Sequence, residues 1–342
     1  RSAGIGQPMA FEATLTNPRP VGQIQSSGKF GPWDTDDPSQ TPVSGRYRFS
    51  DADLSTIRGL AGILSSEGSY SGVLNAIQVQ GETDTPDFAL GISGHPVHLK
   101  TQFNALVDGT RGDTFLRPVT AQILRSTIVA NGGISKAAGE PGRIILLDAV
   151  AKPARLEDLL GLAVKSSQPA MVGGVVIRAK LDLHPGPEDI ARRLKLDADF
   201  QIQSARFTQA DTEQKITRLS RVGQGKREDQ NIQDVALDMQ GHFALEKGVA
   251  TFSSLSFNVP GASVRLNGTF GLASQALDFK GDLLLQAKIS QLTTGIKSIL
   301  LKPVDPFFEG KGAGMVLPIR ITGTKDQPSF GLEIGKVVKR QR

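Results

Sequence analysis

The chain has 342 residues, a formal net charge of +5 and no cysteine, so disulfides and thiolate metal sites are excluded. Tryptophan and tyrosine together number only three, which argues against carbohydrate-binding or nucleic-acid-stacking surfaces built on exposed rings. The longest apolar runs, such as residues 170–177, fall far below the roughly 18 residues that span a bilayer. Because the chain opens with Arg1 and shows no signal peptide, we expect it to be a fragment whose upstream part is missing.

Short strands with one apolar and one polar face are predicted along most of the chain. Side chains alternate across a strand, and apolar residues take alternate positions in 11–15, 97–103, 175–183 and 317–334. Roughly 15 to 18 strand candidates can be identified in this way, and an open sheet of that size normally curls or splits. We therefore predict a mainly β protein, with a long, curved, largely antiparallel sheet that forms an elongated groove.

Five segments carry apolar residues at helical spacing, which predicts a few short amphipathic helices beside the sheet. They are residues 51–65, 155–166, 188–196, 209–222 and 289–301. The first follows an N-cap candidate, Ser50, but contains Gly59 and Gly62, which are poor helix formers, so packing must hold it. Each apolar stripe is expected to pack as core, and the last, beside Pro303, has the alternative of closing one end of the sheet.

No long linker divides the chain, so residues 1–342 are predicted to form a single elongated region with a soft boundary near 138–142. The stretch 35–42 is the most linker-like. A basic cluster marks the carboxyl end and consists of Lys336, Lys339, Arg340 and Arg342. Such a cluster is either a solvated tail or a contact for anionic lipid headgroups or acidic partners.

The clearest alternation lies in residues 241–285. In one strand the apolar positions on a common face are Val264, Leu266, Phe270 and Leu272, and in the next they are Leu277, Phe279, Leu283 and Leu285. Gly281 falls on the same apolar face, which indicates a bulge or a close approach of another chain segment. Because a sheet of this kind must bury its apolar face, what that face contacts decides the function.

No set of residues predicts catalysis. His95 and His98 would point to opposite faces of a strand, and no cysteine or carboxylate pair accompanies them to bind a metal. Asp108 and Asp113 lie in a glycine-containing loop, but a calcium loop would need more oxygen ligands, so a turn is the better interpretation. No phosphate-binding loop or nucleophile elbow is present. We expect a protein that is not an enzyme and that uses no metal or cofactor.

Several passages combine strand alternation with proline and glycine punctuation in a recognisable order. They are residues 54–74 with 80–88, 103–110, 257–264, 277–281, 294–298 and 317–324. In these passages the chain resembles the AsmA-like family of Gram-negative envelope proteins, and its last third is similar to that family's carboxyl-terminal region. The resemblance covers most of the chain from about residue 45 onward.

The resemblance implies an inner-membrane-anchored protein with its bulk in the periplasm, a long β-sheet folded into a groove, and a link to phospholipid movement between membranes. A one-sided apolar sheet that curls lengthwise can shield acyl chains from water, since each buried methylene is worth about 0.8 kcal/mol. The first hypothesis is therefore a periplasmic lipid-binding or lipid-bridging segment. Its partners are phospholipid or another acyl lipid and the membrane, not nucleic acid. Its candidate groove residues are Leu255, Phe257, Val264, Leu266, Phe270, Leu272, Leu277, Phe279, Leu283, Leu285, Leu317 and Ile319.

The second hypothesis is a non-catalytic structural module that assists outer-membrane protein or envelope assembly through contacts with envelope proteins. Its apolar face would pack entirely against helices or a second sheet. By rough count the five helical stripes do not suffice to cover that face, which favours an open groove. An enzyme that acts on lipid would need a nucleophile and a base, and the sequence offers no such pair.

Overall fold

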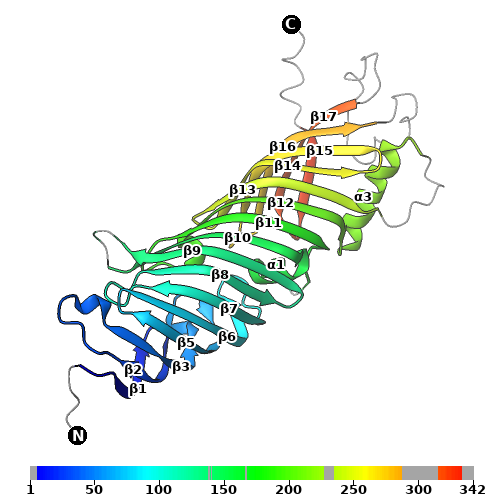
Figure 1. Ribbon diagram of the computed structural model, residues 1–342. Helices are drawn as coiled ribbons and strands as arrows, with labels where there is room; N and C mark the ends of the chain where they lie inside the picture. The colour runs from blue at the N-terminus through cyan, green and yellow to red at the C-terminus, as the bar shows by residue number, and fades with distance from the viewer. Residues whose placement is uncertain are drawn as a thin grey trace. The chain divides into compact units, whose positions relative to one another are not determined.

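The computed structural model describes residues 6–137, 139, 141–165, 168–226, 235–286 and 315–332 (Figure 1). The chain forms two compact units. Unit 1 consists of Arg1–Ala154, Gly161–Ser167 and Ile177–Leu196, and unit 2 consists of Arg155–Leu160, Gln168–Val176 and Asp197–Arg342. The predicted helix over 289–301 and the basic cluster at the carboxyl end lie outside the described residues.

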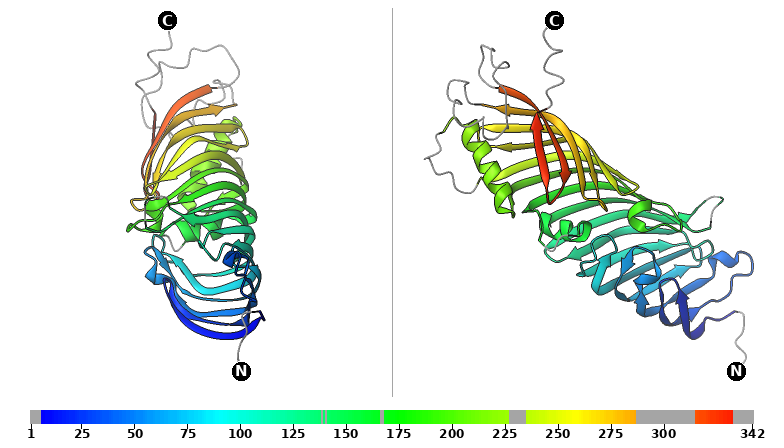
Figure 2. Two further views of the ribbon diagram at one scale, coloured as in Figure 1. Left: turned by 60° about the vertical axis from the view of Figure 1, so that its left-hand side comes forward. Right: turned by 180° about the vertical axis from the view of Figure 1, so that it is seen from behind.

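The prediction of a mainly β protein is confirmed. Within the part of the chain that the structure describes, eighteen strands belong to one antiparallel sheet that is not closed, and the helices are few and short. Figure 2 shows that the strands at the amino-terminal end, β1 (Met9–Pro18) and β2 (Val21–Phe30), bend along their length rather than lying flat.

The remaining strands and helices have the following bounds. In or bordering unit 1 are β3 (Pro42–Asp53), β4 (Leu60–Ala61), β5 (Ile63–Val73), β6 (Ala76–Leu90), β7 (Val97–Val107), β8 (Thr114–Ile123), β9 (Ser126–Lys136) and β10 (Arg143–Arg155). Next along the chain come α1 (Leu156–Ala163), β11 (Met171–Leu183), α2 (Ile190–Arg193) and β12 (Leu194–Phe207). In unit 2 are α3 (Ala210–Gly223), β13 (Leu237–Glu246), β14 (Val249–Val259), β15 (Ala262–Gly271), β16 (Ala276–Leu285), β17 (Met315–Thr324) and β18 (Pro328–Leu332).

Neighbouring strands in the sequence pair with each other, so each unit contains an antiparallel meander. In unit 1, the strands from β1 to β10 pair in sequence order, except that β3 pairs with β5 and the two-residue β4 pairs with β6. In unit 2, the strands from β13 to β18 pair in the same consecutive manner. Directly opposed residues of an antiparallel pair lie on the same face, so the register shows how the alternation of each strand combines into two faces.

Three adjacent rows of opposed residues define the apolar face of unit 1. The central row runs across nine strands and consists of Ala13, Ser26, Tyr47, Gly68, Gly81, Phe103, Val119, Ala130 and Ala149. One flanking row consists of Leu15, Ile24, Phe49, Ser66, Thr83, Thr101, Ala121, Ile128 and Ala151. The other consists of Phe11, Gly28, Gly45, Tyr70, Val79, Ala105, Leu116, Gly132 and Leu147. None of these described positions carries a charge.

The predicted helix over 51–65 is wrong. Strand β3 continues to Asp53, whose side chain accepts a hydrogen bond from Ser55 N–H and caps a single 3-10 turn, η2 (Leu54–Thr56). Gly59 and Gly62 then adopt φ values of +93° and +119°. These values lie in the left-handed region that an α-helix cannot contain, so the chain turns back into β4 and β5 instead.

The other described helix predictions are confirmed in part. Helices α1 and α3 occupy most of the predicted segments 155–166 and 209–222. The segment 188–196 contains only the four-residue α2, because the chain is already extended at Leu194, where β12 begins. The linker-like stretch 35–42 is the β2–β3 connection and holds a short 3-10 turn, η1 (Pro38–Gln40), so it joins no separate domains.

Gly281 marks a close approach, not a bulge. The register from β15 to β16 and from β16 to β17 continues through Gly281 without a shift. A Cβ atom at this position would collide with the backbone carbonyl oxygen of Arg265 and would lie 2.9 Å from the Cα of Leu266. The glycine therefore allows the neighbouring strand to pass close to it.

Candidate functional site

The centre of the apolar face of unit 1 is partly exposed. Every residue of the central row, including Tyr47, Phe103 and Val119, is either partly or fully exposed, and none is buried. The buried apolar residues of unit 1 gather mainly near strand ends, as Ala52, Ala89, Val97 and Ile123 show. Partly exposed apolar side chains at mid-strand indicate a surface that another apolar group can cover.

One end of this face is closed by the protein itself. Ile190 N–H at the start of α2 donates to the carbonyl oxygen of Arg58 at 3.1 Å, and Arg58 Nη1 donates to the carbonyl oxygen of Pro187 at 3.1 Å. Leu54 of η2, four residues before Arg58, is buried. The α2 segment is therefore held against the η2–β4 connection, whereas the central row in mid-strand is not buried.

Aromatic rings lie across glycines on the neighbouring strands of the apolar face. A Cβ atom at Gly68 would lie 2.8 Å from Cε1 of Tyr47, and one at Gly81 would lie 2.6 Å from the Tyr47 hydroxyl oxygen. Tyr70 lies across Gly45 in the same way, with a separation of 2.6 Å to its hydroxyl oxygen. Rings held flat over glycine make the face smoother than upright side chains would.

The hydroxyl groups of both tyrosines are satisfied within the apolar face. Ser26 Oγ donates to the carbonyl oxygen of Arg46 at 3.0 Å, so the Tyr70 hydroxyl donates to Ser26 Oγ at 2.7 Å. Ser66 Oγ likewise donates to a backbone carbonyl at 2.9 Å, and the Tyr47 hydroxyl donates to Ser66 Oγ at 3.2 Å. Burial raises the pKa of Tyr47, which keeps this hydroxyl neutral. With these polar atoms paired, the face acts as an apolar surface.

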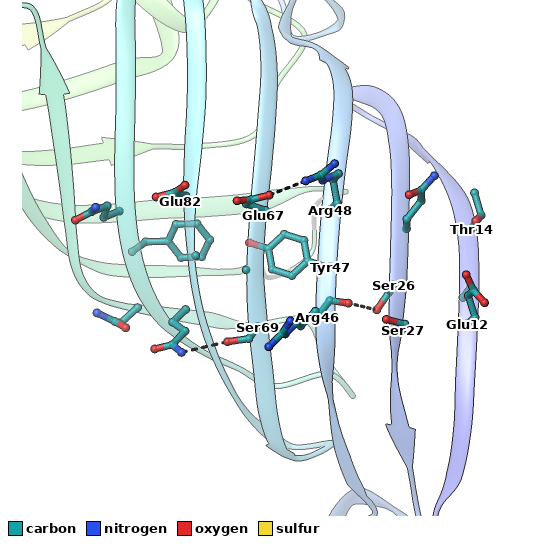
Figure 3. A pocket seen from close by; sticks show the side chains of 18 of the residues that line it. Glu12, Thr14, Ser26, Ser27, Arg46, Tyr47, Arg48, Glu67, Ser69 and Glu82 are labelled. Atoms are coloured by element: carbon teal, nitrogen blue, oxygen red, sulfur yellow. Dashed lines mark hydrogen bonds and ion pairs between the residues drawn. The ribbon is translucent and has the colours of Figure 1, made fainter.

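The opposite face of unit 1 has a hollow of about 990 Å³ across strands β1 to β8, whose lining is mostly polar (Figure 3). Nearer β10 this face also carries exposed apolar side chains, namely Phe115, Leu146 and Val150. In the hollow, the Arg48 guanidinium and the Glu67 carboxylate point toward each other, 3.1 Å apart, and Gln80 Nε2 donates to Ser69 Oγ at 3.1 Å. Both residues of the Arg48–Glu67 pair are exposed. Mixed charges on an exposed surface of this kind are typical of a solvated face.

The twelve groove candidates predicted in the last third lie together on the apolar face of unit 2. Six of them are buried, namely Val264, Leu266, Phe279, Leu283, Leu285 and Leu317. The other six are partly exposed, namely Leu255, Phe257, Phe270, Leu272, Leu277 and Ile319. Half of the predicted groove thus belongs to the packed interior of this unit.

The register explains why these candidates are closely packed. Phe257 lies opposite Val264, which lies opposite Leu283, which in turn lies opposite Leu317. On the same face the ring of Phe252 is 5.4 Å, centre to centre, from the rings of both Phe243 and Phe279. Large apolar residues in direct opposition fill the space above the strands.

Helix α3 adds to the packing of unit 2 at the β14–β15 turn. Ser220 Oγ donates to the carbonyl oxygen of Pro260 at 2.8 Å, and both Ser220 and Val222 are buried. Gly223 sits so close to Gly261 that a Cβ atom on either would collide with the backbone of this contact. The helix is therefore fixed against the strand ends.

Two of the histidines, His98 and His242, lie beside carboxylates. His98 Nε2 is 2.6 Å from an oxygen of Asp84, and His242 Nδ1 is 3.1 Å from an oxygen of Asp199. The His242 partner could not be predicted from the local sequence, because Asp199 lies on another strand, β12. Within the described ranges, no group of three or more histidine and carboxylate side chains is placed to hold a metal ion. The loop at Asp108 is a turn as predicted, with its carboxylate accepting from Thr110 N–H at 2.8 Å.

Sequence reasoning missed the partly exposed face of unit 1. The signal that could have found it is the recurrence of glycine, serine and threonine among the apolar positions of β2 to β7, as at Ser26, Gly68 and Thr83. In the part of the chain that the structure describes, no helix has the length and apolar content to cross a membrane. Comparison with protein-family models, curated proteins and solved structures finds no match to this chain.

Proposed function

We propose that the apolar face of unit 1 binds lipid acyl chains and that the protein is a lipid-binding or lipid-bridging segment for phospholipid. The observation that carries this proposal is the central row: nine opposed positions on nine strands, none charged and none buried. A soluble surface with this character is normally covered by a partner.

The extent of the face suits an acyl chain. Nine strands spaced by about 4.8 Å give a row roughly 38 Å long. An acyl chain spans about half of the hydrocarbon core of a bilayer, which is about 30 Å thick, so the row exceeds twice the length of one chain. Since each buried methylene contributes about 0.8 kcal/mol, even partial cover of a chain is substantial.

The face has no single deep site, which suits movement along it. Successive strands offer similar small or flat apolar groups, such as Gly68 and Gly81 beneath the Tyr47 ring. A bound chain therefore meets similar surroundings when it shifts by one strand. Transfer along such a track needs no catalytic group, only weak and similar binding at each step.

We also propose the biological setting that the resemblance implies. The chain would belong to the AsmA-like family, lie in the periplasm of a Gram-negative bacterium, and be attached to the inner membrane in its full-length form. It would carry phospholipid between the inner and outer membranes, with the membranes as partners. What supports this setting is the sequence resemblance together with the open antiparallel sheet.

The test is lipid retention by two variants that differ only in the face they alter. Phe103→Asp places a carboxylate in the central row, whereas Gln102→Asp places one on the adjacent position of the polar face. Each protein is purified from bacteria, transferred to detergent-free buffer, and examined by native mass spectrometry with lipid extraction. We expect Phe103→Asp to lose bound phospholipid and Gln102→Asp to retain it, with unchanged far-UV circular dichroism. Equal lipid in both folded variants would contradict the proposal.

Unit 2 favours a second candidate, the non-catalytic module that assists outer-membrane protein or envelope assembly through contacts with envelope proteins. The observation behind it is the burial of Val264, Leu283 and Leu317, because about half of this apolar face is filled by the protein itself. A folded wild-type protein that carries no lipid in the same measurement would favour this candidate over the first.

A further inference from the structure

We propose that unit 1 has a second binding site, on the face opposite the apolar face, which holds one molecule of an anionic amphiphile. Its headgroup binds in the basic hollow, a depression of about 630 Å³ across strands β3, β5, β6, β7 and β8. Its apolar part lies on the apolar strip, which is the row Leu106, Phe115, Gly133 and Leu146. Because the site is on the other side of the sheet, this inference does not depend on acyl-chain binding at the apolar face.

The basic hollow carries positive charge without a carboxylate. Its lining includes Arg46 and Arg117 but no aspartate or glutamate, whereas three glutamates line the larger hollow beside it. Within the described part of the chain, neither of these two guanidinium groups forms an ion pair. Arg48 differs, because its guanidinium is joined to the Glu67 carboxylate (Figure 3). A concave surface with unpaired charges of one sign attracts a ligand of the opposite sign, so the hollow favours an anion.

Hydrogen-bonding groups lie between the two arginines. The register places four polar side chains in one row across β3, β5, β6 and β7, namely Arg46, Ser69, Gln80 and Asn104. Arg117 follows at the bulge of β8, where the register with β7 shifts. Figure 3 shows Arg46 reaching toward Ser69, whose Oγ accepts from Gln80 Nε2 at 3.1 Å and keeps its own proton to donate. Guanidinium, hydroxyl and amide donors in one row suit a phosphate and the hydroxyl groups of a headgroup.

The apolar strip begins where the basic hollow ends. Leu106 lines the hollow and lies opposite Phe115, which lies opposite Gly133. Leu146 of β10 opposes the same glycine from the other side. Phe115 is 54% exposed and Leu146 is 51% exposed, and a Cβ atom at Gly133 would lie 3.9 Å from Cδ1 of Phe115. The two large side chains therefore flank a glycine, and together they form an exposed apolar surface that a ligand can cover.

The order of these two parts favours a single amphiphilic molecule. The apolar strip covers three strand spacings of about 4.8 Å, or roughly 14 Å. This length is close to half of the hydrocarbon core of a bilayer, which is about 30 Å thick and is the distance that one acyl chain spans. A bilayer presents a flat surface that does not fill a hollow, whereas one molecule can place its headgroup in the hollow and its chain along the strip. The arginines select an anionic headgroup.

The test is isothermal titration calorimetry at low salt with dihexanoyl phosphatidylglycerol, kept below its critical micelle concentration. We expect it to bind more tightly than dihexanoyl phosphatidylcholine, which has no net charge. Arg46→Gln and Arg117→Gln should each weaken its binding by about tenfold. The matched control is Arg48→Gln, which removes the same charge two residues away on the same face and should leave binding unchanged. Unchanged circular dichroism shows that each variant is folded.

The apolar half of the site is tested with the headgroup alone. Phe115→Ser should weaken lipid binding by about fivefold and leave glycerol 3-phosphate binding unchanged. Phe103→Asp alters the apolar face and should not change either affinity, so failure of this site is distinguishable from failure of the proposed function. Equal effects of Arg46→Gln and Arg48→Gln, or glycerol 3-phosphate that binds as tightly as the lipid, would overturn the proposal. Binding to intact phosphatidylglycerol vesicles but not to the monomeric lipid would overturn it too.

Discussion

Truncation of one leucine in each unit measures how closely each apolar face is covered. Leu283 of β16 is 5% exposed and lies between Val264 and Leu317, which are also buried. Leu147 of β10 is partly exposed and lies opposite Gly132, which offers it no side chain. Both residues are leucines in mid-strand on an apolar face, so the two variants differ mainly in how closely neighbouring side chains cover the leucine.

The expected losses in the free energy of unfolding differ by about threefold between Leu283→Ala and Leu147→Ala. Leucine-to-alanine changes in packed cores cost about 2 to 5 kcal/mol, because the lost transfer free energy is joined by that of the cavity left behind. We expect Leu283→Ala to lower the free energy of unfolding by about 3 kcal/mol. At Leu147 part of the side chain already contacts solvent and the opposed Gly132 offers no side chain, so we expect a smaller loss, about 1 kcal/mol.

Urea denaturation followed by far-UV circular dichroism measures both values. With a denaturant dependence of about 3 kcal/mol per molar urea, Leu283→Ala should lower the midpoint by about 1 M, and Leu147→Ala by roughly a third of that. Matching native spectra control for a change of fold. Equal losses at the two positions would refute the reasoning, because they would mean that the apolar face of unit 1 is as closed as that of unit 2.

Three further outcomes follow from individual contacts. Gly81→Ala should lower the free energy of unfolding by about 1 to 3 kcal/mol, since its Cβ would lie 2.6 Å from the Tyr47 hydroxyl and 2.7 Å from a backbone oxygen; Gly174→Ala, which meets nothing within 4 Å, is the thermal-denaturation control. Because the pKa of Tyr47 is raised in the folded state, its contribution is present below the ordinary tyrosine pKa of about 10 and is lost as the pH rises above it. The stability of wild type should thus fall more steeply above that pH than that of Tyr47→Phe. Asp278→Asn breaks an exposed pair with Arg320 at 3.0 Å, so it should cost under about 1 kcal/mol, and less in 1 M salt.

The strands were predictable because their signal is local. Alternation with a period of two is visible within a few residues, as in β1 and β7, and pairing of successive strands follows from the short turns between them. The helix predicted over 51–65 failed because apolar spacing alone does not report backbone conformation. Gly59 and Gly62 carry the positive φ values that break this segment. The spacing of its leucines predicted a helix but carries no information about these backbone angles.

The candidate site was less predictable than the fold, because exposure depends on what lies above a strand. The candidate groove residues were predicted where the alternation is densest, around Val264 and Leu283. The structure places those two residues in a packed interior. The partners that bury them lie on other strands, and the register that aligns them is set by pairing over the whole meander. No local pattern distinguishes a face that is covered from one that remains partly open.

The composition of the two apolar faces accounts for their different exposure. Where large residues oppose one another on successive strands, as Phe257, Val264 and Leu283 do, their side chains contact each other and exclude solvent without a ligand. Where glycine opposes an aromatic ring, as Gly68 opposes Tyr47, the ring lies flat and the surface above it stays accessible. A face that holds a mobile lipid chain must be uncharged, and its own side chains must leave space for the lipid. The apolar rows of unit 1 meet both conditions, so a charge in their centre should reduce lipid binding more than a charge in the denser rows of unit 2.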